Sequence, residues 1–134
     1  MQNKSNNINI KAKKVEEEET LILYHNNRCA KSRQALKILE NSGLKFDTIE
    51  YLKKPLTEKE IKNLLKLLQL NAENIIRKGE LLYKEKFATT NISENEWIKI
   101  LANNPVLIER PILVKGNKAI LARAPEKILE LLNT

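Results

Sequence analysis

The order of apolar and amphipathic segments predicts an α/β fold with a mixed four-stranded sheet. Two short apolar segments, at residues 20–24 and 45–52, flank a helix-forming segment at residues 29–40. Two more, at residues 112–114 and 119–121, surround a Gly-Asn pair and predict an antiparallel hairpin. The predicted order is therefore β-α-β, then helices, then β-β-α, in which the helix-connected strands are parallel.

Local signals place the remaining helices. Thr57 and Ser93 each precede a glutamate by three residues, which is the capping-box pattern of a helix N-terminus. Residues 71–87 predict short helical pieces joined at Gly79. Pro125 predicts the start of a last helix, because the missing N–H of proline has no cost in a first turn. These helices fill the chain between the second strand and the hairpin, and follow the hairpin.

The composition favours one globular domain. The chain has 134 residues, of which 42% are apolar, and no apolar run approaches the ~18 residues of a membrane span. Residues 1–19 are polar and highly charged, so we expect a disordered extension before a domain at residues 20–134. A single cysteine excludes a disulfide framework. Without the apolar stretch of a secretory signal, we expect a cytoplasmic protein.

The net charge of +7 favours small anions over nucleic acids as partners. Lysines alternate with glutamates along the predicted helices, as at residues 58–62, which is typical of a solvated face. Aromatic residues make up only 4%, so a stacking platform for single strands is missing. No long apolar seam remains after the core is assigned, so we expect a monomer.

The only cysteine, Cys29, lies directly before the first predicted helix. Unpaired N–H groups and the positive end of the helix dipole favour its thiolate, which is the nucleophilic form. Ser32 stands where a redox Cys-x-x-Cys motif has its second cysteine, so a redox cycle needs a thiol from another molecule. Its hydroxyl either bonds the sulfur or is a tolerated first-turn group. The only histidine, His25, either supports the thiolate or is a structural hydrogen-bonder.

Three arginines lie at the ends of predicted buried elements: Arg77, Arg110 and Arg123. The planar guanidinium fork suits tetrahedral oxyanions. Taken singly, each arginine is explained more simply as a surface or ion-pair residue. Arg110, which directly precedes Pro111, is the strongest individual candidate for an anion site.

Four segments resemble those of the glutaredoxin-coupled arsenate reductases, the ArsC family. Residues 25–33, His-Asn-Asn-Arg-Cys-Ala-Lys-Ser-Arg, resemble its active-site pattern His-Asn-x-x-Cys-x-x-Ser-Arg. Residues 75–78, 107–112 and 122–126 resemble its three arginine segments in the same order. Four ordered segments are far more specific than one Cys-x-x-Ser motif.

The chain departs from the family pattern at two positions. Many members have proline where this chain has Asn27. The usual Arg-Pro pair near the end is split by Ala124, which leaves open the direction in which the Arg123 side chain points.

The resemblance implies a thioredoxin-like fold with a cis bond before Pro111. It also implies that the Cys29 thiolate reduces arsenate, or a similar oxyanion, with glutathione as co-substrate and glutaredoxin as partner. No bound cofactor or metal is implied. The residues that would bind the oxyanion are Arg77, Arg110 and Arg123, and those that would support the thiolate are Ser32 and His25.

Two other functions remain open. The fold also resembles that of the Spx-type transcriptional regulators, which bind RNA polymerase. Those typically have a Cys-x-x-Cys switch and no arginine at the position of Arg123, so Ser32 and Arg123 both favour the reductase. A second alternative is a family member that acts on another substrate, such as a glutathione mixed disulfide. Fold alone cannot separate these functions.

Overall fold

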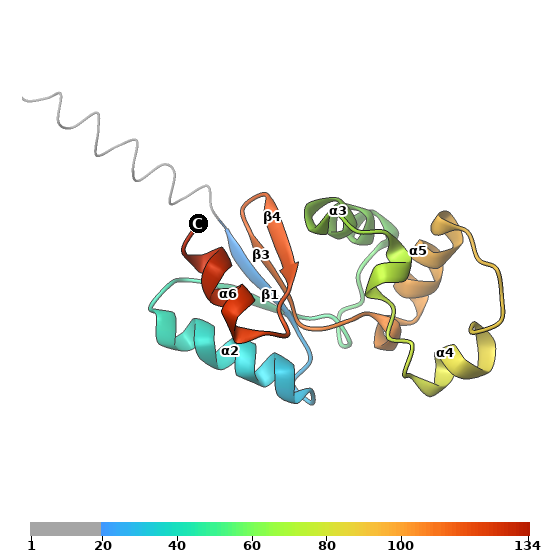
Figure 1. Ribbon diagram of the computed structural model, residues 1–134, viewed down its shortest axis with the longest axis horizontal. Helices are drawn as coiled ribbons and strands as arrows, with labels where there is room; N and C mark the ends of the chain where they lie inside the picture. Colours follow the sequence, from blue (N-terminus) through green and yellow to red (C-terminus); the bar gives the residue numbers. More distant parts are fainter. Residues whose placement is uncertain (1–19) are drawn as a thin grey trace, which may run out of the picture.

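The sheet of the computed structural model has four strands, and residues 20–134 are described; the predicted extension at residues 1–19 lies outside them. The strands are β1 (Leu21–His25), β2 (Asp47–Glu50), β3 (Ile112–Lys115) and β4 (Lys118–Leu121). Their order is β2-β1-β3-β4. β1 and β2 are parallel, and the other two pairs are antiparallel. The predicted mixed four-stranded sheet and the β-α-β, β-β-α order are therefore confirmed (Figure 1).

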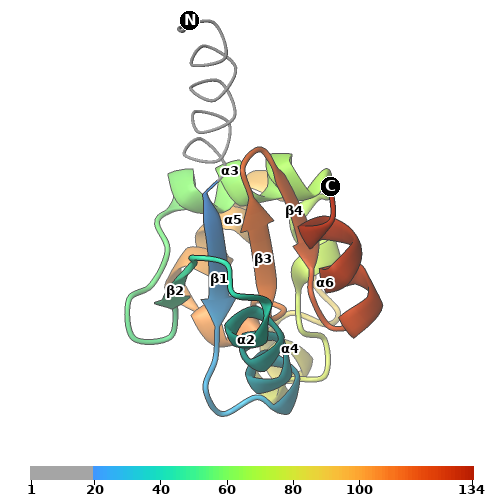
Figure 2. The same ribbon diagram turned by 90° about the vertical axis from the view of Figure 1, so that its left-hand side faces the viewer.

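Helices cover both faces of the sheet (Figures 1 and 2). One face is covered by α2 (Ala30–Ser42) and α6 (Pro125–Leu132), and the other by α3 (Glu58–Leu68), η1 (Ala72–Ile75), α5 (Glu94–Asn103) and η2 (Pro105–Leu107), with α4 (Leu81–Lys86) beside them. Each layer has its own apolar cluster. Leu113 belongs to the cluster under α2 and α6, whereas Ile112 and Val114 belong to the opposite one. This alternation follows from the two-residue period of a strand.

The local start signals are confirmed. The Thr57 hydroxyl accepts from the Glu60 N–H at 3.1 Å, and the Glu60 carboxylate accepts from the Thr57 N–H at 2.8 Å. Ser93 begins α5 in the same way. The helix predicted at residues 29–40, with a stop near residues 41–43, runs from Ala30 to Ser42. It ends at Gly43 with φ of 77°, a left-handed conformation that glycine adopts without strain. No helix within residues 20–134 combines the length and apolarity needed to cross a bilayer.

The second strand is shorter than predicted, and the difference matters for the site. Pairing stops at Glu50, whose carbonyl accepts from the N–H groups of Lys53 and Lys54 at 2.9 and 3.0 Å. This turn takes Tyr51 away from the sheet edge and into the core, where its side chain is only 1% exposed. Its hydroxyl donates to the Ile108 carbonyl at 3.2 Å.

The hairpin places two arginines at one end of the sheet. Ile112 of β3 pairs with Leu121 of β4, so the residues just outside this pair are neighbours. The N–H of Ala122 also donates to the Pro111 carbonyl at 2.8 Å, which extends the pairing by one step. The bond before Pro111 is cis, as the resemblance implied. Arg110 and Arg123 are therefore brought together by strand register.

Candidate active site

Cys29 is the N-cap residue of α2, at the end of a turn that its own neighbours build. The Cys29 N–H donates to the Asn26 carbonyl at 3.0 Å, and the Arg28 N–H donates to the Asn26 side chain, also at 3.0 Å. The Arg33 N–H then donates to the Cys29 carbonyl at 3.0 Å, which begins the helix. The thiol is half-buried and lies beside the free N–H groups of the first turn.

The surroundings lower the pKa of the Cys29 thiol from 9.0 to about 7. Burial is the largest single influence, and it raises the pKa because it disfavours the charged form. Hydrogen bonding from the Ser32 backbone N–H, the Arg110 side chain and the Lys31 backbone N–H, together with the charge of Arg110, outweighs it. A larger share of the thiol is therefore ionised at neutral pH than in an ordinary cysteine.

Ser32 is fully buried, and its hydroxyl is engaged with the turn that precedes Cys29. Its Oγ accepts from the Asn26 N–H at 3.2 Å. The contribution of Ser32 to the lowered thiol pKa comes through its backbone N–H, not its hydroxyl. The sequence left open whether this hydroxyl bonds the sulfur, and the hydrogen bond found for it is to the Asn26 N–H. This bond forms because the tight turn leaves the Asn26 N–H buried and in need of an acceptor.

His25 ends β1 and is 4% exposed. Within residues 20–134, its Nδ1 has no hydrogen-bond partner, and His25 is not among the groups that shift the Cys29 pKa. It lines a surface hollow of about 580 Å³ with Asn27 and side chains of α2 and β2. Its predicted role in supporting the thiolate stays a prediction.

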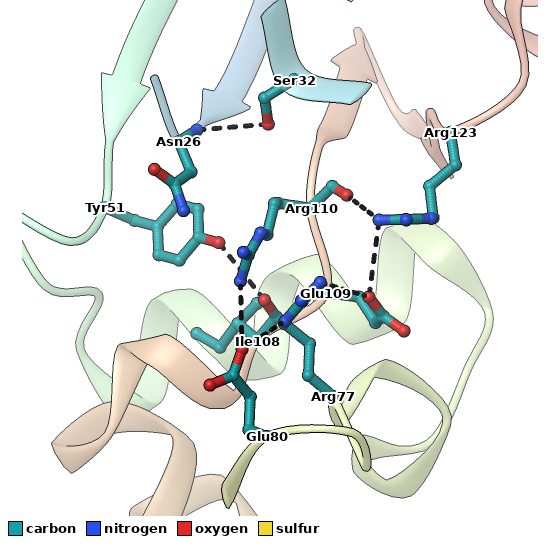
Figure 3. A network of polar contacts seen from close by, with 9 residues as sticks. All are labelled: Asn26, Ser32, Tyr51, Arg77, Glu80, Ile108, Glu109, Arg110 and Arg123. Carbon is teal, nitrogen blue, oxygen red and sulfur yellow. Dashed lines mark hydrogen bonds and ion pairs between the residues drawn. The ribbon is translucent and has the colours of Figure 1, made fainter. Parts of the chain in front are cut away.

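The three predicted arginines come together although they lie far apart in the sequence. A short pairing of Ile76 with Ile108 joins the two segments that carry Arg77 and Arg110. The Arg77 N–H donates to the Leu107 carbonyl at 2.7 Å. From the other side, Arg123 Nη1 donates to the Arg110 carbonyl at 2.7 Å. Figure 3 shows the three side chains converging from separate segments.

Two carboxylates that the sequence analysis did not single out lie among the arginines. Glu80 Oε2 lies 3.1 Å from Arg77 Nε and 4.0 Å from Arg110 Nη1. Glu109 Oε1 lies 3.4 Å from Arg77 Nη1 and 3.8 Å from Arg123 Nη1 (Figure 3). We call these three arginines and two glutamates the arginine cluster. The Glu109–Arg110 adjacency was visible in the sequence, whereas no signal pointed to Glu80.

Arg110 is the member of the arginine cluster with unused donors. Its side chain is 12% exposed, and within residues 20–134 its buried Nε and Nη1 atoms have no hydrogen-bond partner. Its guanidinium also acts on Tyr51, whose pKa burial raises to about 12 despite the nearby positive charges of Arg110 and Arg77. The Tyr51 phenol therefore stays protonated and adds no charge. Tyr51 was not predicted as a site residue, because residues 45–52 predicted a strand.

This arrangement places a candidate nucleophile beside a candidate anion site. A thiolate at a helix N-terminus lies against a buried guanidinium that has free donors, so a bound oxyanion would meet the sulfur and the positive charge together. Among the described residues, no three His, Cys, Asp or Glu side chains lie close enough to share a metal ion. The chemistry that these residues support is nucleophilic attack on a small oxyanion.

Comparison with known proteins identifies the family. The sequence profile of the ArsC family matches residues 24–131. The chain belongs to the ArsC family. Arsenate reductase of Haemophilus influenzae is 36% identical over 115 residues, covering 84% of this chain and 99% of that protein. YfgD of Escherichia coli strain K12, which is uncharacterised, is 40% identical over 111 residues, covering 81% and 93%. The solved arsenate reductase of Vibrio cholerae has a TM-score of 0.78 and 38% identity, covering 84% and 97%.

The two departures from the ArsC pattern have structural explanations. The Asn27 carbonyl accepts from Arg33 Nη1 at 3.0 Å, an interaction that a proline carbonyl could also make. Ala124 is the N-cap of α6, and Pro125 still occupies the first turn. Arg123 keeps its side chain on the Arg110 carbonyl. The chain thus has the cysteine and the three arginines of the ArsC pattern in one place.

Proposed function

We propose that this ArsC-family protein reduces arsenate to arsenite through Cys29, with glutathione as co-substrate and glutaredoxin as partner. The observation that carries the proposal is the Arg110 guanidinium, buried with unused donors beside a thiol whose pKa is lowered to about 7. A thiolate and an oxyanion-binding fork in contact are what thiol attack on arsenate requires. Relatives named arsenate reductase support the choice of arsenate.

The proposed reaction has three steps. The Cys29 thiolate attacks arsenic(V), an arsenate oxygen leaves as water after protonation, and a sulfur–arsenic bond forms without a change in oxidation state. The glutathione thiolate then attacks the Cys29 sulfur, and the electron pair of the sulfur–arsenic bond passes to arsenic, which leaves as arsenite. Glutaredoxin finally reduces the Cys29–glutathione disulfide by thiol exchange. Two thiols are oxidised to one disulfide while arsenic gains two electrons.

The chain's own residues have distinct roles in this scheme. Arg110 binds the oxyanion and stabilises the negative charge that develops as the sulfur attacks. Arg77 and Arg123 flank the bound oxyanion and fix its orientation. The first-turn N–H groups of Lys31 and Ser32 hold the thiolate. Since Cys29 is the only cysteine, an external thiol has to resolve the intermediate, and a glutathione-containing cytoplasm is the compartment that fits.

A coupled assay tests the proposal. Purified protein, arsenate, glutathione and glutaredoxin should produce arsenite, and Cys29→Ser should lower kcat/KM by more than about 10³-fold because no other nucleophile is present. Glu130→Gln on α6 is a matched surface control and should keep full activity. Arsenite formation by Cys29→Ser at a substantial rate would rule out Cys29 as the nucleophile.

A second candidate is thiol exchange on a glutathione mixed disulfide. The site residues it needs are the same, namely a cysteine with a lowered pKa beside the positively charged Arg110 side chain. The same preparation should then reduce a glutathionylated peptide in the absence of arsenate. Turnover of that peptide without any arsenite formation would replace the arsenate proposal with this one.

A further inference from the structure

The arginine cluster is largely neutralised from within. Three guanidiniums and two carboxylates leave one net positive charge, and the Cys29 thiolate cancels that charge when it forms. Glu80 occupies Arg77 Nε, and Glu109 lies within 4 Å of both Arg77 and Arg123. Arg77 therefore has both its Nε and its Nη1 hydrogen-bonded to carboxylates. Within residues 20–134, Arg110 Nε and Nη1 have no hydrogen-bond partner, although Nη1 lies 4.0 Å from Glu80. An incoming anion meets an almost neutral site rather than three unopposed positive charges.

The two carboxylates are placed where they repel such an anion. Their side chains are 26% and 27% exposed, so solvent screens their charge only in part. Any oxyanion that reaches Arg110 also lies near Glu80, because Glu80 Oε2 is 4.0 Å from Arg110 Nη1. Coulomb energy is proportional to the charge of the ligand, so a dianion experiences twice the repulsion of a monoanion.

The geometry points to Glu80 and Glu109 as specificity-determining residues that shift the preference of this site from doubly charged tetrahedral oxyanions toward singly charged ones of the same shape. The inference rests on the proposed oxyanion site and extends it by naming the charge of the substrate. For arsenate, the shift favours the dihydrogen monoanion relative to the dianion. For other substrates, it favours any tetrahedral oxyanion with one charge.

A purely structural role for the two glutamates makes a different prediction. If Glu109 only positioned Arg77 and Arg123, its replacement would loosen the site and weaken the binding of every anion alike. If it sets the charge of the site, its replacement strengthens binding, and the factor for a dianion is the square of the factor for a monoanion. Comparing two anions of one shape and different charge therefore separates the two roles.

The test uses Cys29 as its own reporter. Because the chain has one cysteine, every alkylation by iodoacetamide reports on the active-site thiol. Sulfate and perchlorate are tetrahedral anions with two charges and one, and each is added at fixed pH and constant ionic strength. The measured quantity is the anion concentration that halves each variant's own alkylation rate. It is obtained for the wild type, Glu109→Gln, Glu80→Gln and the surface control Glu130→Gln.

We expect Glu109→Gln to lower the half-protecting concentration about threefold for perchlorate and therefore about tenfold for sulfate, since Coulomb energy scales with ligand charge. Glu80→Gln should also lower both half-protecting concentrations, with the larger change for sulfate. Glu130→Gln should change neither. An equal change for both anions, or weaker protection by both, overturns the inference and leaves the glutamates a positioning role. Arsenite formation is measured in the same preparations, so that the two proposals can fail separately. If arsenite forms but the ratio of the sulfate to the perchlorate half-protecting concentration is the same in all variants, only this inference fails. Failure of both anions to protect any variant defeats the oxyanion site itself.

Discussion

Cys29 and the arginine cluster are in contact, yet they are held in place by different kinds of interaction. The cysteine segment is held by hydrogen bonds between residues at most six positions apart, most of them to Asn26. The arginine cluster is held by ion pairs and carbonyl contacts that join Arg77 to Glu109, 32 positions away, and Arg123 to Arg110, 13 positions away. The proposed nucleophile is therefore held by local structure, and the proposed anion site by tertiary structure.

The contrast shows where each property of the site comes from. A cysteine at a helix N-terminus is stabilised as a thiolate wherever the turn before the helix forms. The charge that surrounds the thiolate depends on which distant side chains the fold brings beside it. Only Arg110 belongs to both parts, because its side chain acts on the Cys29 sulfur while its backbone carbonyl holds Arg123. Substitutions at Arg110 should therefore have the largest effects, and substitutions confined to one part smaller ones.

The largest effect is expected for Arg110→Ala in the arsenate assay. It should lower kcat/KM by about 10²- to 10³-fold, because it removes the unused donors and the charge that faces the sulfur. Arg123→Ala is the comparison variant, with an expected loss of about tenfold, since the Arg123 side chain is 43% exposed and already occupied. Equal losses of kcat/KM for the two variants would show that the arginines act as one unit and that Arg110 contributes no more than Arg123. Circular dichroism of both variants verifies the fold.

A smaller effect is expected on the pH dependence of Cys29 alkylation. The thiolate is the reactive, deprotonated form, so the rate should rise with pH around a midpoint near 7, where an ordinary thiol would have its midpoint near 9. Arg110→Met keeps the bulk that buries the sulfur but removes the hydrogen bond and the positive charge. It should move the midpoint up by roughly one unit, because both lost interactions favour the charged form. An unchanged midpoint would show that Arg110 has no influence on the pKa of the Cys29 thiol.

The smallest effect on the chemistry is expected for Ser32→Ala. It removes the acceptor of the buried Asn26 N–H, so the free energy of unfolding should fall by about 1–3 kcal/mol. The thiol midpoint should move by less than about half a unit, because the backbone N–H of residue 32 remains in place. Urea unfolding and the alkylation profile measure the two quantities. Ser42→Ala, at the other end of α2, is the control for a serine near a helix end. A midpoint shift as large as that of Arg110→Met would restore the hydroxyl as the group that bonds the sulfur.

Much of the fold was predictable because its signals are local. The capping boxes at Thr57 and Ser93 and the helix stop at Gly43 each depend on a few neighbouring residues. The two short apolar segments and the Gly-Asn pair between them predicted the hairpin for the same reason. The end of β2 was misplaced because Tyr51, a good strand former, continues the apolar pattern past Glu50. Its ring is instead buried against Ile108, 57 positions away in the chain.

The sequence by itself determined the family and the position of the proposed nucleophile. Cys29 is the only thiol, its place before a helix follows from residues next to it, and the arginine segments occur in the ArsC order. Only the tertiary structure decided what surrounds that thiol. It placed Tyr51 at the site, turned the Ser32 hydroxyl to Asn26, and set Glu80 and Glu109 among the arginines. The physical reason is that a charge acts through space, so the balance of the site depends on distances between segments that the order of residues along the chain does not contain.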